Sequence, residues 1–577
     1  MDALKHKSYY SEALAGLLAE CTDIPVEELV GAVETPADPK MGHFAFPCFK
    51  LAKALKKAPP LIAKDLAERI MEKRSPWLSE AVATGPYVNF FLNRAEYAKD
   101  VLAKIRENGE KYGASDQGKG KTVVMDYSSP NIAKPLHVGH LGSTLIGKAI
   151  DNIYRFLGYN LVSINHLGDW GTQFGKLITA YLRWGSREEI EKTEIDGLVK
   201  LYVRFHDEAE KDASLNDEAR AWVVKMQNGD EEGLALWRWF VDLSIREYNR
   251  SYKRMGISFD FMRGESYYTD MMDGVAKELT DKGLLKESEG ARIVDLEEYK
   301  MPPCLILRGD GGTLYPTRDI AAAIDRYKEF KFDLCLYVTG NEQSLHFAQW
   351  MKVIELMGYP WAAGLVHISY GMSLFEGGKL STRKGDVIKV EGLLDEAVSK
   401  TLAIIEEKNP NLADKETVAE QVGVGALTFN QLYTGRIKDT MFNWDRMLNF
   451  EGETGPYVQY THARACSVME KGGLSADAAP SALVDTEFLT DDESFEVLRV
   501  MNDFPSKVEE AAAKYEPFII ARQIMALSQA FNAFYHKHVI LVDDIPVRTA
   551  RLALTSAVRQ VLKTGLNLLN IVAPQAM

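Results

Sequence analysis

Two histidines three residues apart form the most specific chemical pattern in this sequence, in the segment His137-Val138-Gly139-His140. Residues 121–125, just upstream, are apolar and partly β-branched, which is typical of a buried strand. Apolar residues then recur at helical spacing from position 141 to position 156. Because a helix N-terminus carries unpaired N–H groups and partial positive charge, this strand–helix junction predicts a site for nucleotide phosphates.

The residue types around the junction suit phosphate chemistry. Gly139 would let a phosphate approach the backbone closely, and Gly142 would keep the next turn open. His137 and His140 can each donate a hydrogen bond to a phosphate oxygen whose charge grows during displacement, and Lys134 adds a full charge. A metal-binding pair and two structural histidines are the alternatives. The preceding strand, the Ser-Ser-Pro-Asn run and the following helix favour the phosphate site.

A second cationic motif lies far downstream, in Gly-Gly-Lys-Leu-Ser-Thr-Arg-Lys-Gly-Asp-Val-Ile at residues 377–388. Lys379, Arg383 and Lys384 crowd a loop bounded by glycines, directly after a predicted strand. Its small residues permit motion, and its cations suit a triphosphate whose leaving group gains charge. The alternative is a solvated basic hairpin tip.

The elements that must position these motifs alternate between strand and helix, and they predict a Rossmann-like parallel sheet within a multidomain α/β protein. Further strands are expected at 161–165, 333–338 and 365–370. The expected domains are a mixed α+β domain at residues 1–115, a catalytic domain at 120–390 with a mostly helical insertion at about 176–265, a connecting helical segment at 391–450, and an all-α domain at 451–577.

Composition restricts the class of protein. The chain has 577 residues, 46% of them hydrophobic, and a net charge of −14. Its five cysteines are scattered and form no CxxC pair, which predicts reduced thiols in a cytoplasmic protein and no structural zinc. We expect neither a signal peptide nor a membrane span. The acidic total does not suggest a nucleic-acid binder, yet a local basic face can coexist with it.

Together, the two loops resemble the HIGH and KMSKS signatures of the class I aminoacyl-tRNA synthetases. Within that class, the resemblance is to the arginyl-tRNA synthetases, and it covers essentially the whole chain. Thr382 stands where the signature has its second lysine, and Leu380 where it has methionine. The resemblance is carried by residues 128–141, 166–171, 314–321, 337–347, 457–464, 515–518, 531–535 and 573–577.

This resemblance implies that arginine is activated by ATP, entering with Mg²⁺, and is then transferred to the 3′ end of tRNA(Arg). It implies a C-terminal anticodon-binding bundle and an N-terminal domain that holds the outer corner of the tRNA. We expect no tightly bound metal and a monomer. The roles it assigns are catalysis to His137, His140, Lys134 and Lys379, ATP binding to Gly139, Gly142, Leu380, Ser381, Arg383 and Lys384, and arginine binding to Asp126, Ser129, Asn131, Tyr315, Asp319 and Gln343.

The implied arginine pocket agrees in part with the chemistry of a guanidinium, which is planar, permanently charged and rich in donors. Tyr315 and Asp319 lie four residues apart, so on a helix they share a face, and Asp319 would be the carboxylate partner. Helix capping is the alternative role for Asp319. Asp126 and Asn131 would hold the α-ammonium group, although the family more often has glutamate at the first of these positions.

The C-terminal segment predicts the RNA-binding surface. Arg548, Arg551, Arg559 and Lys563 lie at offsets of 3, 11 and 15, close to one stripe of a helix, with no acidic residue from 545 onward. Such a stripe suits a single-stranded loop of tRNA, and a solvated helix face is the alternative. Two rivals remain for the whole chain: a small-molecule nucleotidyltransferase, and a non-catalytic RNA-binding paralogue.

Overall fold

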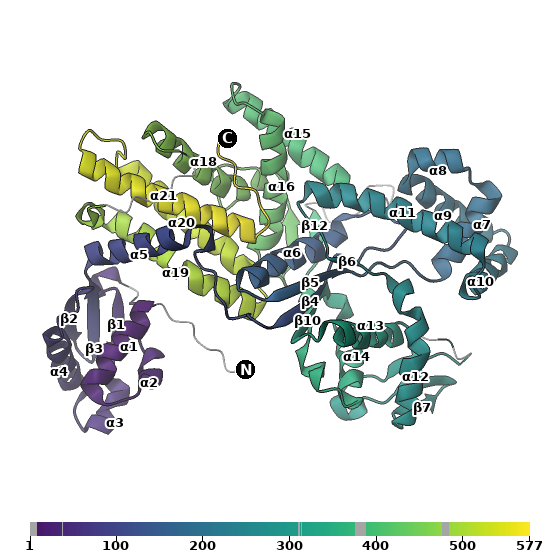
Figure 1. Ribbon diagram of the computed structural model, residues 1–577, viewed down its shortest axis with the longest axis horizontal. Coiled ribbons are helices and arrows are strands. Elements are labelled where there is room, and N and C mark those ends of the chain that lie inside the picture. The colour runs from purple at the N-terminus through teal and green to yellow at the C-terminus, as the bar shows by residue number, and fades with distance from the viewer. Residues whose placement is uncertain (1–8, 37, 310–311, 313, 376–387, 476–483) are drawn as a thin grey trace.

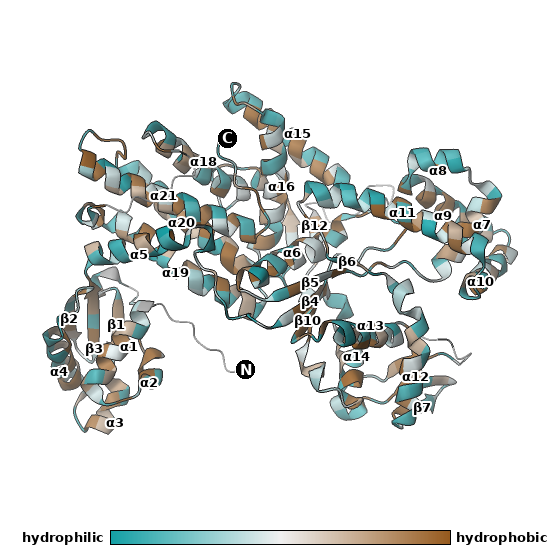
Figure 2. Ribbon diagram, viewed as in Figure 1, coloured by the Kyte–Doolittle hydropathy of each residue, from teal (hydrophilic) through white to brown (hydrophobic). Residues whose placement is uncertain are grey.

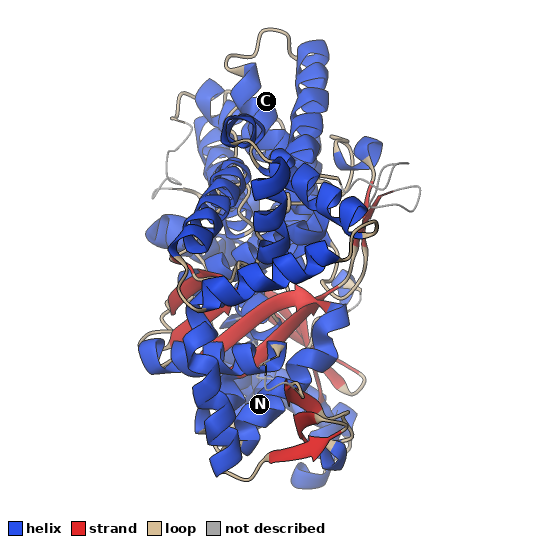
Figure 3. Cartoon of the chain, turned by 90° about the vertical axis from the view of Figure 1, so that its right-hand side faces the viewer, coloured by secondary structure: helices blue, strands red, loops and turns tan. Residues whose placement is uncertain are grey.

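The computed structural model describes residues 9–36, 38–309, 312, 314–375, 388–475 and 484–577. A parallel sheet lies at the centre, with the helical C-terminal part above it, a helical insertion to one side and two smaller lobes below (Figure 1). The turned view places the strands of the sheet between helices on both sides (Figure 3). Among the described residues, no helix is both long and apolar enough to cross a membrane.

The N-terminal lobe packs helices on a three-stranded antiparallel sheet of order β1-β3-β2. The face of α4 that carries Ile62, Leu66 and Ile70 is buried, because these residues recur every four positions. They pack with Val88 and Phe90 of β3 in one apolar core. The elements are α1 (Tyr9–Thr22), α2 (Val26–Val30), β1 (Phe44–Pro47), α3 (Leu51–Leu55), α4 (Pro59–Glu72), β2 (Leu78–Thr84) and β3 (Tyr87–Leu92), followed by the connecting helix α5 (Arg94–Asn108).

The central sheet has five parallel strands in the order β11-β10-β4-β5-β6, which confirms the predicted fold class. Side chains of a strand alternate between its faces, so Met125 joins the core around α6, whereas Val124 joins the core around α13 and α14. Figure 2 shows hydrophobic residues along these strands. The bounds are β4 (Thr122–Asp126), α6 (Leu141–Phe156), β5 (Asn160–Asn165), β6 (Phe261–Met262), α13 (Tyr315–Phe330), β10 (Leu334–Gly340), α14 (Ser344–Leu356) and β11 (Leu365–Tyr370).

Two excursions interrupt this sheet. A five-helix insertion lies between β5 and β6, and a lobe with the antiparallel sheet β7-β8-β9 precedes α13. Residues from these inserted segments lie near the ends of the sheet strands. Their elements are α7 (Thr172–Trp184), α8 (Arg187–Thr193), α9 (Ile195–Ala209), α10 (Ser214–Gln227) and α11 (Glu231–Arg254), then α12 (Met272–Asp281), β7 (Leu285–Ser288), β8 (Ala291–Val294) and β9 (Cys304–Leu307).

The C-terminal part is helical, apart from β13, which pairs in parallel with β12. The aromatic residues Phe531 and Phe534 of α20 are fully buried, as expected for a helical core. The elements are β12 (Ser373–Phe375), α15 (Val390–Lys408), α16 (Lys415–Tyr433), β13 (Thr440–Phe442), α17 (Trp444–Met447), α18 (Gly455–Lys471), α19 (Asp492–Lys514), α20 (Phe518–Lys537) and α21 (Ile545–Leu568).

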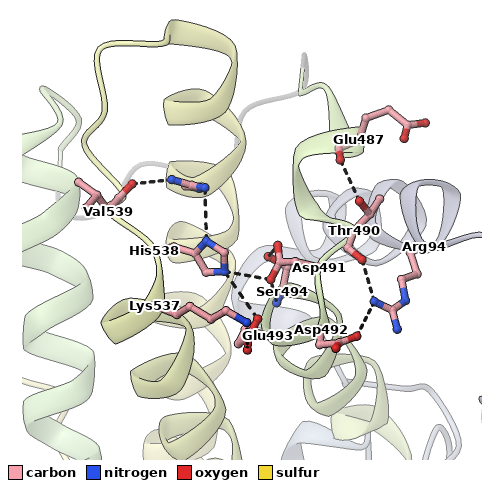
Figure 4. Close-up of polar contacts among 11 residues, drawn as sticks. Arg94, Glu487, Thr490, Asp491, Asp492, Glu493, Ser494, Lys537, His538 and Val539 are labelled. Atoms are coloured by element: carbon pink, nitrogen blue, oxygen red, sulfur yellow. Dashed lines mark hydrogen bonds and ion pairs between the residues drawn. The ribbon is translucent and has the colours of Figure 1, made fainter. Parts of the chain in front are cut away.

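A small stack of side chains docks the N-terminal lobe on α19. Arg94 donates one Nη1 group to the Thr490 carbonyl and to Asp492, both at 2.8 Å, as drawn in Figure 4. Its guanidinium also lies 4.9 Å from the ring centre of Phe495, and the His43 ring lies 4.3 Å from the same ring. Beside this stack runs a groove of about 1680 Å³ between the lobe and α19. These residues thus contribute to the docking of the lobe on α19.

His43 makes this docking sensitive to acid. Its Nδ1 accepts a hydrogen bond from the Leu92 N–H at 2.8 Å, so that nitrogen must carry no proton. Burial, with the nearby charge of Arg94, lowers the pKa of His43 from 6.5 to about 4. Between pH 6.5 and pH 4, the unfolded chain therefore binds a proton at His43 that the folded lobe does not bind. The contribution of neutral His43 to the stability of the fold is complete above pH 6.5 and is lost as the pH falls toward 4.

We expect acidification from pH 7 to pH 4.5 to loosen the N-terminal lobe more in the wild type than in the His43→Asn variant. The asparagine amide oxygen can accept the Leu92 N–H, and it does not titrate. Hydrogen–deuterium exchange of residues 87–92 at both pH values measures the difference. Equal acid sensitivity of the two proteins would exclude His43 as the titrating group.

Candidate active site

The loop that follows β4 has a strained backbone held by buried hydrogen bonds. Ser128, Ser129 and Ala133 have positive φ angles of 74°, 49° and 60°, a region that L-residues adopt at a cost. The Ser128 N–H donates to Ser143 Oγ at 2.8 Å, and the Ser129 N–H donates to Asn165 Oδ1 at 3.0 Å. The fold therefore imposes this loop conformation from both α6 and β5.

The helical insertion also holds this loop. The Tyr248 hydroxyl of α11 lies 2.7 Å from the carbonyl oxygens of both Asn131 and Lys134. Ser244, one turn earlier on α11, accepts the Ala133 N–H at 3.0 Å. The side chains of Asn131 and Lys134 themselves stay exposed at the end of β4. Sequence reasoning missed Tyr248 and Ser244, because nothing in a helical pattern tells which of its polar residues faces a distant loop.

The geometry of the two signature histidines fixes the position of their protons. His137 Nδ1 accepts the Gly139 N–H, and His140 Nδ1 accepts the His137 N–H, both at 3.1 Å. Burial, followed by the proximity of His137, lowers the pKa of His140 to about 3, while burial and Lys134 lower the pKa of His137. Both rings are therefore neutral, with the proton on Nε2.

These two Nε2–H groups are donors at the start of α6, with the ring centres 3.9 Å apart. No third metal-ligating side chain joins His137 and His140 among the residues that the structure describes. A pair of neutral donors at a helix N-terminus suits the oxygens of a phosphate group. The geometry thus favours the phosphate hypothesis over the metal pair.

The two predicted glycines have different surroundings. A Cβ atom on Gly142 would lie 2.4 Å from the Tyr370 ring of β11, so close helix–strand packing explains this glycine. This packing is a second reason for glycine at this position, and the predicted role of Gly142 at a phosphate stays a prediction. A Cβ atom on Gly139 would meet only the ring of His137, at 2.9 Å.

Lys379, Leu380, Ser381, Arg383 and Lys384 lie outside the described residues. The chain that follows them returns to the histidine turn. The Val138 N–H donates to the Ile388 carbonyl at 3.0 Å, and the Val390 N–H donates to the Leu136 carbonyl at 2.9 Å. Residues 388–390, at and after the end of the second motif, are thus joined by backbone hydrogen bonds to the first motif, across some 250 residues of sequence.

Asp126 is buried at the end of β4, where it is paired with a residue that the sequence did not single out. Its Oδ1 accepts the Ser129 hydroxyl at 2.8 Å, and its Oδ2 lies 2.8 Å from Nη2 of Arg326, which is only 1% exposed. The Arg326 guanidinium also lies near the rings of Tyr268 and Tyr337. The sequence signal that could have indicated this pair is an arginine on the buried face of α13, seven residues after Asp319.

The predicted guanidinium pocket lies at the start of α13. Tyr315 is 67% exposed and opens the helix, and Asp319 is the fifth residue, so it is not a capping residue. Instead, Asp319 Oδ2 lies 2.5 Å from Nε2 of His346. The neighbouring Arg318 pairs with Glu265 at 2.6 Å, and burial raises the pKa of Glu265 to about 7. Arg318 is thus paired with Glu265, and Asp319 is paired with His346.

The remaining predicted arginine-binding residues, Asn131 and Gln343, lie in the segments that follow β4 and β10. Asn131 forms a backbone bridge to Gly168, and its side chain occupies the space that a Cβ atom on Gly168 would need. Gln343 is exposed and immediately precedes α14. The structure thus places Asn131 on one loop of the sheet edge and Gln343 on another.

The basic stripe of α21 is not an open surface. Arg559 is 2% exposed, which contradicts its predicted contact with tRNA. Arg551 donates to the Val539 carbonyl at 2.7 Å, Arg548 lies 3.4 Å from the Val542 carbonyl, and Lys563 pairs with Glu110 at 2.9 Å. Neighbouring segments thus cover the face of α21 on which these basic residues lie.

His538 belongs to the same covered region. Its Nε2 lies 3.0 Å from Asp491 and 3.7 Å from Glu493, as Figure 4 shows, and these three residues are the one group of three metal-ligating side chains within the described residues. However, an Arg551 N–H lies 3.3 Å from His538 Nδ1. Accepting that donor leaves the proton on Nε2, which faces the carboxylates as a hydrogen-bond donor and leaves no lone pair there for a metal ion.

Three family models match most of the chain. Residues 8–92 match the arginyl tRNA synthetase N terminal domain, residues 101–444 the catalytic domain of tRNA synthetases class I (R), and residues 458–577 the DALR anticodon binding domain.

The arginine–tRNA ligase of Alkaliphilus metalliredigens is 53% identical over 95% of this chain and 96% of its own length, and that of Clostridioides difficile is 51% identical over 98% of this chain and 100% of its own length. The structure of Thermus thermophilus arginyl-tRNA synthetase superposes with a TM-score of 0.81 at 26% identity, covering 98% of this chain and 100% of that one.

The buried ion pair makes a prediction about stability. Arg326→Met leaves the Asp126 carboxylate buried without its partner, and we expect a loss of about 3–5 kcal/mol in the free energy of unfolding. Adding Asp126→Asn removes the second charge and should restore most of that loss. Denaturant unfolding of the full chain, followed by fluorescence, compares the two. A double variant that is as unstable as the sum of the single variants would show that the pair is not the cause.

Proposed function

The chain belongs to the arginyl-tRNA synthetase family and is an arginine–tRNA ligase, and on this premise we propose how its residues divide the reaction. Arginine attacks the α-phosphate of ATP, which gives arginyl-adenylate and diphosphate. The arginyl group then passes to the 3′-terminal adenosine of the tRNA, and AMP leaves. No protein nucleophile is needed, since positioning and electrostatics carry such a reaction.

The ATP site consists of the histidine turn and the cationic loop. The observation that supports it most strongly is the pair of Nδ1 acceptor bonds, which leave Nε2–H of His137 and of His140 as donors at the start of α6. Gly139 gives the phosphates access, and Lys134 adds charge. Lys379, Leu380, Ser381, Arg383 and Lys384 complete the site from the second motif, and Mg²⁺ arrives with the ATP.

The arginine site uses the other side of the same strand end. Asp319 and Tyr315 take the guanidinium, and Gln343 completes the contacts. Ser129 and Asn131 take the α-ammonium group, with Asp126 acting through the Ser129 hydroxyl that it holds. A neutral analogue such as citrulline leaves the Asp319 carboxylate without a charged partner, and lysine lacks the planar fork, so both are rejected.

The N-terminal lobe and the C-terminal helices bind tRNA(Arg). Arg548, Arg551 and Lys563 are half-buried and remain proposed contacts, whose internal bonds must open when RNA binds. We place the reaction in the cytoplasm, where the five buried free thiols stay reduced, and assign it to a monomer.

We expect ATP–diphosphate exchange that depends on arginine and, by the usual behaviour of the family, on tRNA. Exchange is measured with and without tRNA(Arg), with each of several amino acids. Exchange with a different amino acid, or none with tRNA(Arg) supplied, would refute the arginine site.

Asp319→Asn should raise the KM for arginine about 10- to 100-fold, because a hydrogen bond to a charged group contributes about 1.5–3 kcal/mol. The KM for ATP should stay within a few-fold of wild type. Asp281→Asn is a matched control, since Asp281 is an exposed aspartate on α12. An equal loss for both substrates would remove Asp319 from the pocket.

A further inference from the structure

The carboxylate of Asp319 is held on one side only. Its Oδ2 lies 2.5 Å from Nε2 of His346, a short contact typical of a charged acceptor. For its Oδ1, the described part of the chain offers no hydrogen-bond donor. The nearest cation in sequence, Arg318, is directed to Glu265 instead. One oxygen of the carboxylate is therefore fixed, and the other is open.

His346 projects from a rigid base. It lies in the first turn of α14, next to the buried Phe347. Phe347 stacks on the His367 ring of β11 at 4.4 Å with an interplanar angle of 5°, and it also contacts Trp350 and Tyr337. His346 meets the edge of Phe347 at 5.7 Å. Because Phe347 anchors the turn to the sheet, the position of His346 Nε2 is set by the core.

We propose that His346 is a positioning residue for arginine specificity: it fixes the Asp319 carboxylate so that Oδ1 faces the incoming guanidinium. This inference rests on the proposed role of Asp319. An unrestrained carboxylate rotates about its side-chain bonds, and holding it in one orientation before the substrate arrives removes that cost from binding. His346 is therefore retained when arginine binds, rather than displaced by it.

An alternative role for His346 predicts the opposite change in arginine binding, which makes the inference testable. If His346 merely occupied the place of the guanidinium, removing it would strengthen arginine binding. If it positions Asp319, removing it weakens binding. His346→Leu keeps a similar volume without a donor, and His346→Gln keeps an N–H group at similar reach.

In diphosphate exchange, we expect His346→Leu to raise the KM for arginine about 10- to 100-fold, with kcat and the KM for ATP within about threefold of wild type. His346→Gln should recover the arginine KM to within a few-fold. Leu345→Ala, at the exposed neighbouring position of α14, is the control and should have no effect. An arginine KM that is unchanged or lower in His346→Leu overturns the inference. If His346→Leu folds poorly, His346→Ala replaces it.

The Asp319→Asn background separates this inference from the proposed function. There, His346→Leu should add no further loss, because its effect passes through the carboxylate. An additional, multiplicative loss overturns the positioning role. If Asp319→Asn alone leaves the arginine KM at the wild-type value, the proposed pocket fails. If it raises that KM while His346→Leu does not, only the inference about His346 fails.

Discussion

The active site depends on giving each carboxylate at the sheet edge a hydrogen-bonded partner. Removing an ion from water costs several kcal/mol unless a partner and hydrogen bonds compensate. Asp126 meets this condition through Arg326 and Ser129, and Asp319 through His346. Each of these partners comes from α13, from α14 or from the loop after β4. These contacts therefore link α13 and α14 to the sheet edge.

The same edge is assembled from segments far apart in the chain. The helix α11 of the insertion fixes the strained loop through Tyr248 and Ser244, and residues 388–390 bind the histidine turn from the other side. Positive φ angles at Ser128 and Ser129 persist because Ser143 and Asn165 accept the N–H groups of these two residues. Two neutral histidines lie at the start of α6, and one open carboxylate oxygen lies on α13, so the positions of these groups are set before any substrate arrives.

The sequence predicted the parts whose signals are local. Strands such as β4 and β10 were recognised because apolar residues run without interruption, and α6 because its apolar residues recur every four positions. The strand β6 has two residues and follows a long insertion, so no periodicity marks it. Arg326 and His346 were missed, since the buried neighbour of a charged residue depends on tertiary packing. For the same reason, the helical offsets of α21 could not tell that Arg559 is covered.

The most direct test is the structure of the full chain bound to L-arginine. We expect the guanidinium within hydrogen-bond distance of Asp319 Oδ1, His346 still on Oδ2, and the ion pair between Asp126 and Arg326 unchanged. A guanidinium bound away from Asp319, or a His346 displaced from the carboxylate, would contradict the central claim that His346 fixes one oxygen of Asp319 and leaves the other open for arginine.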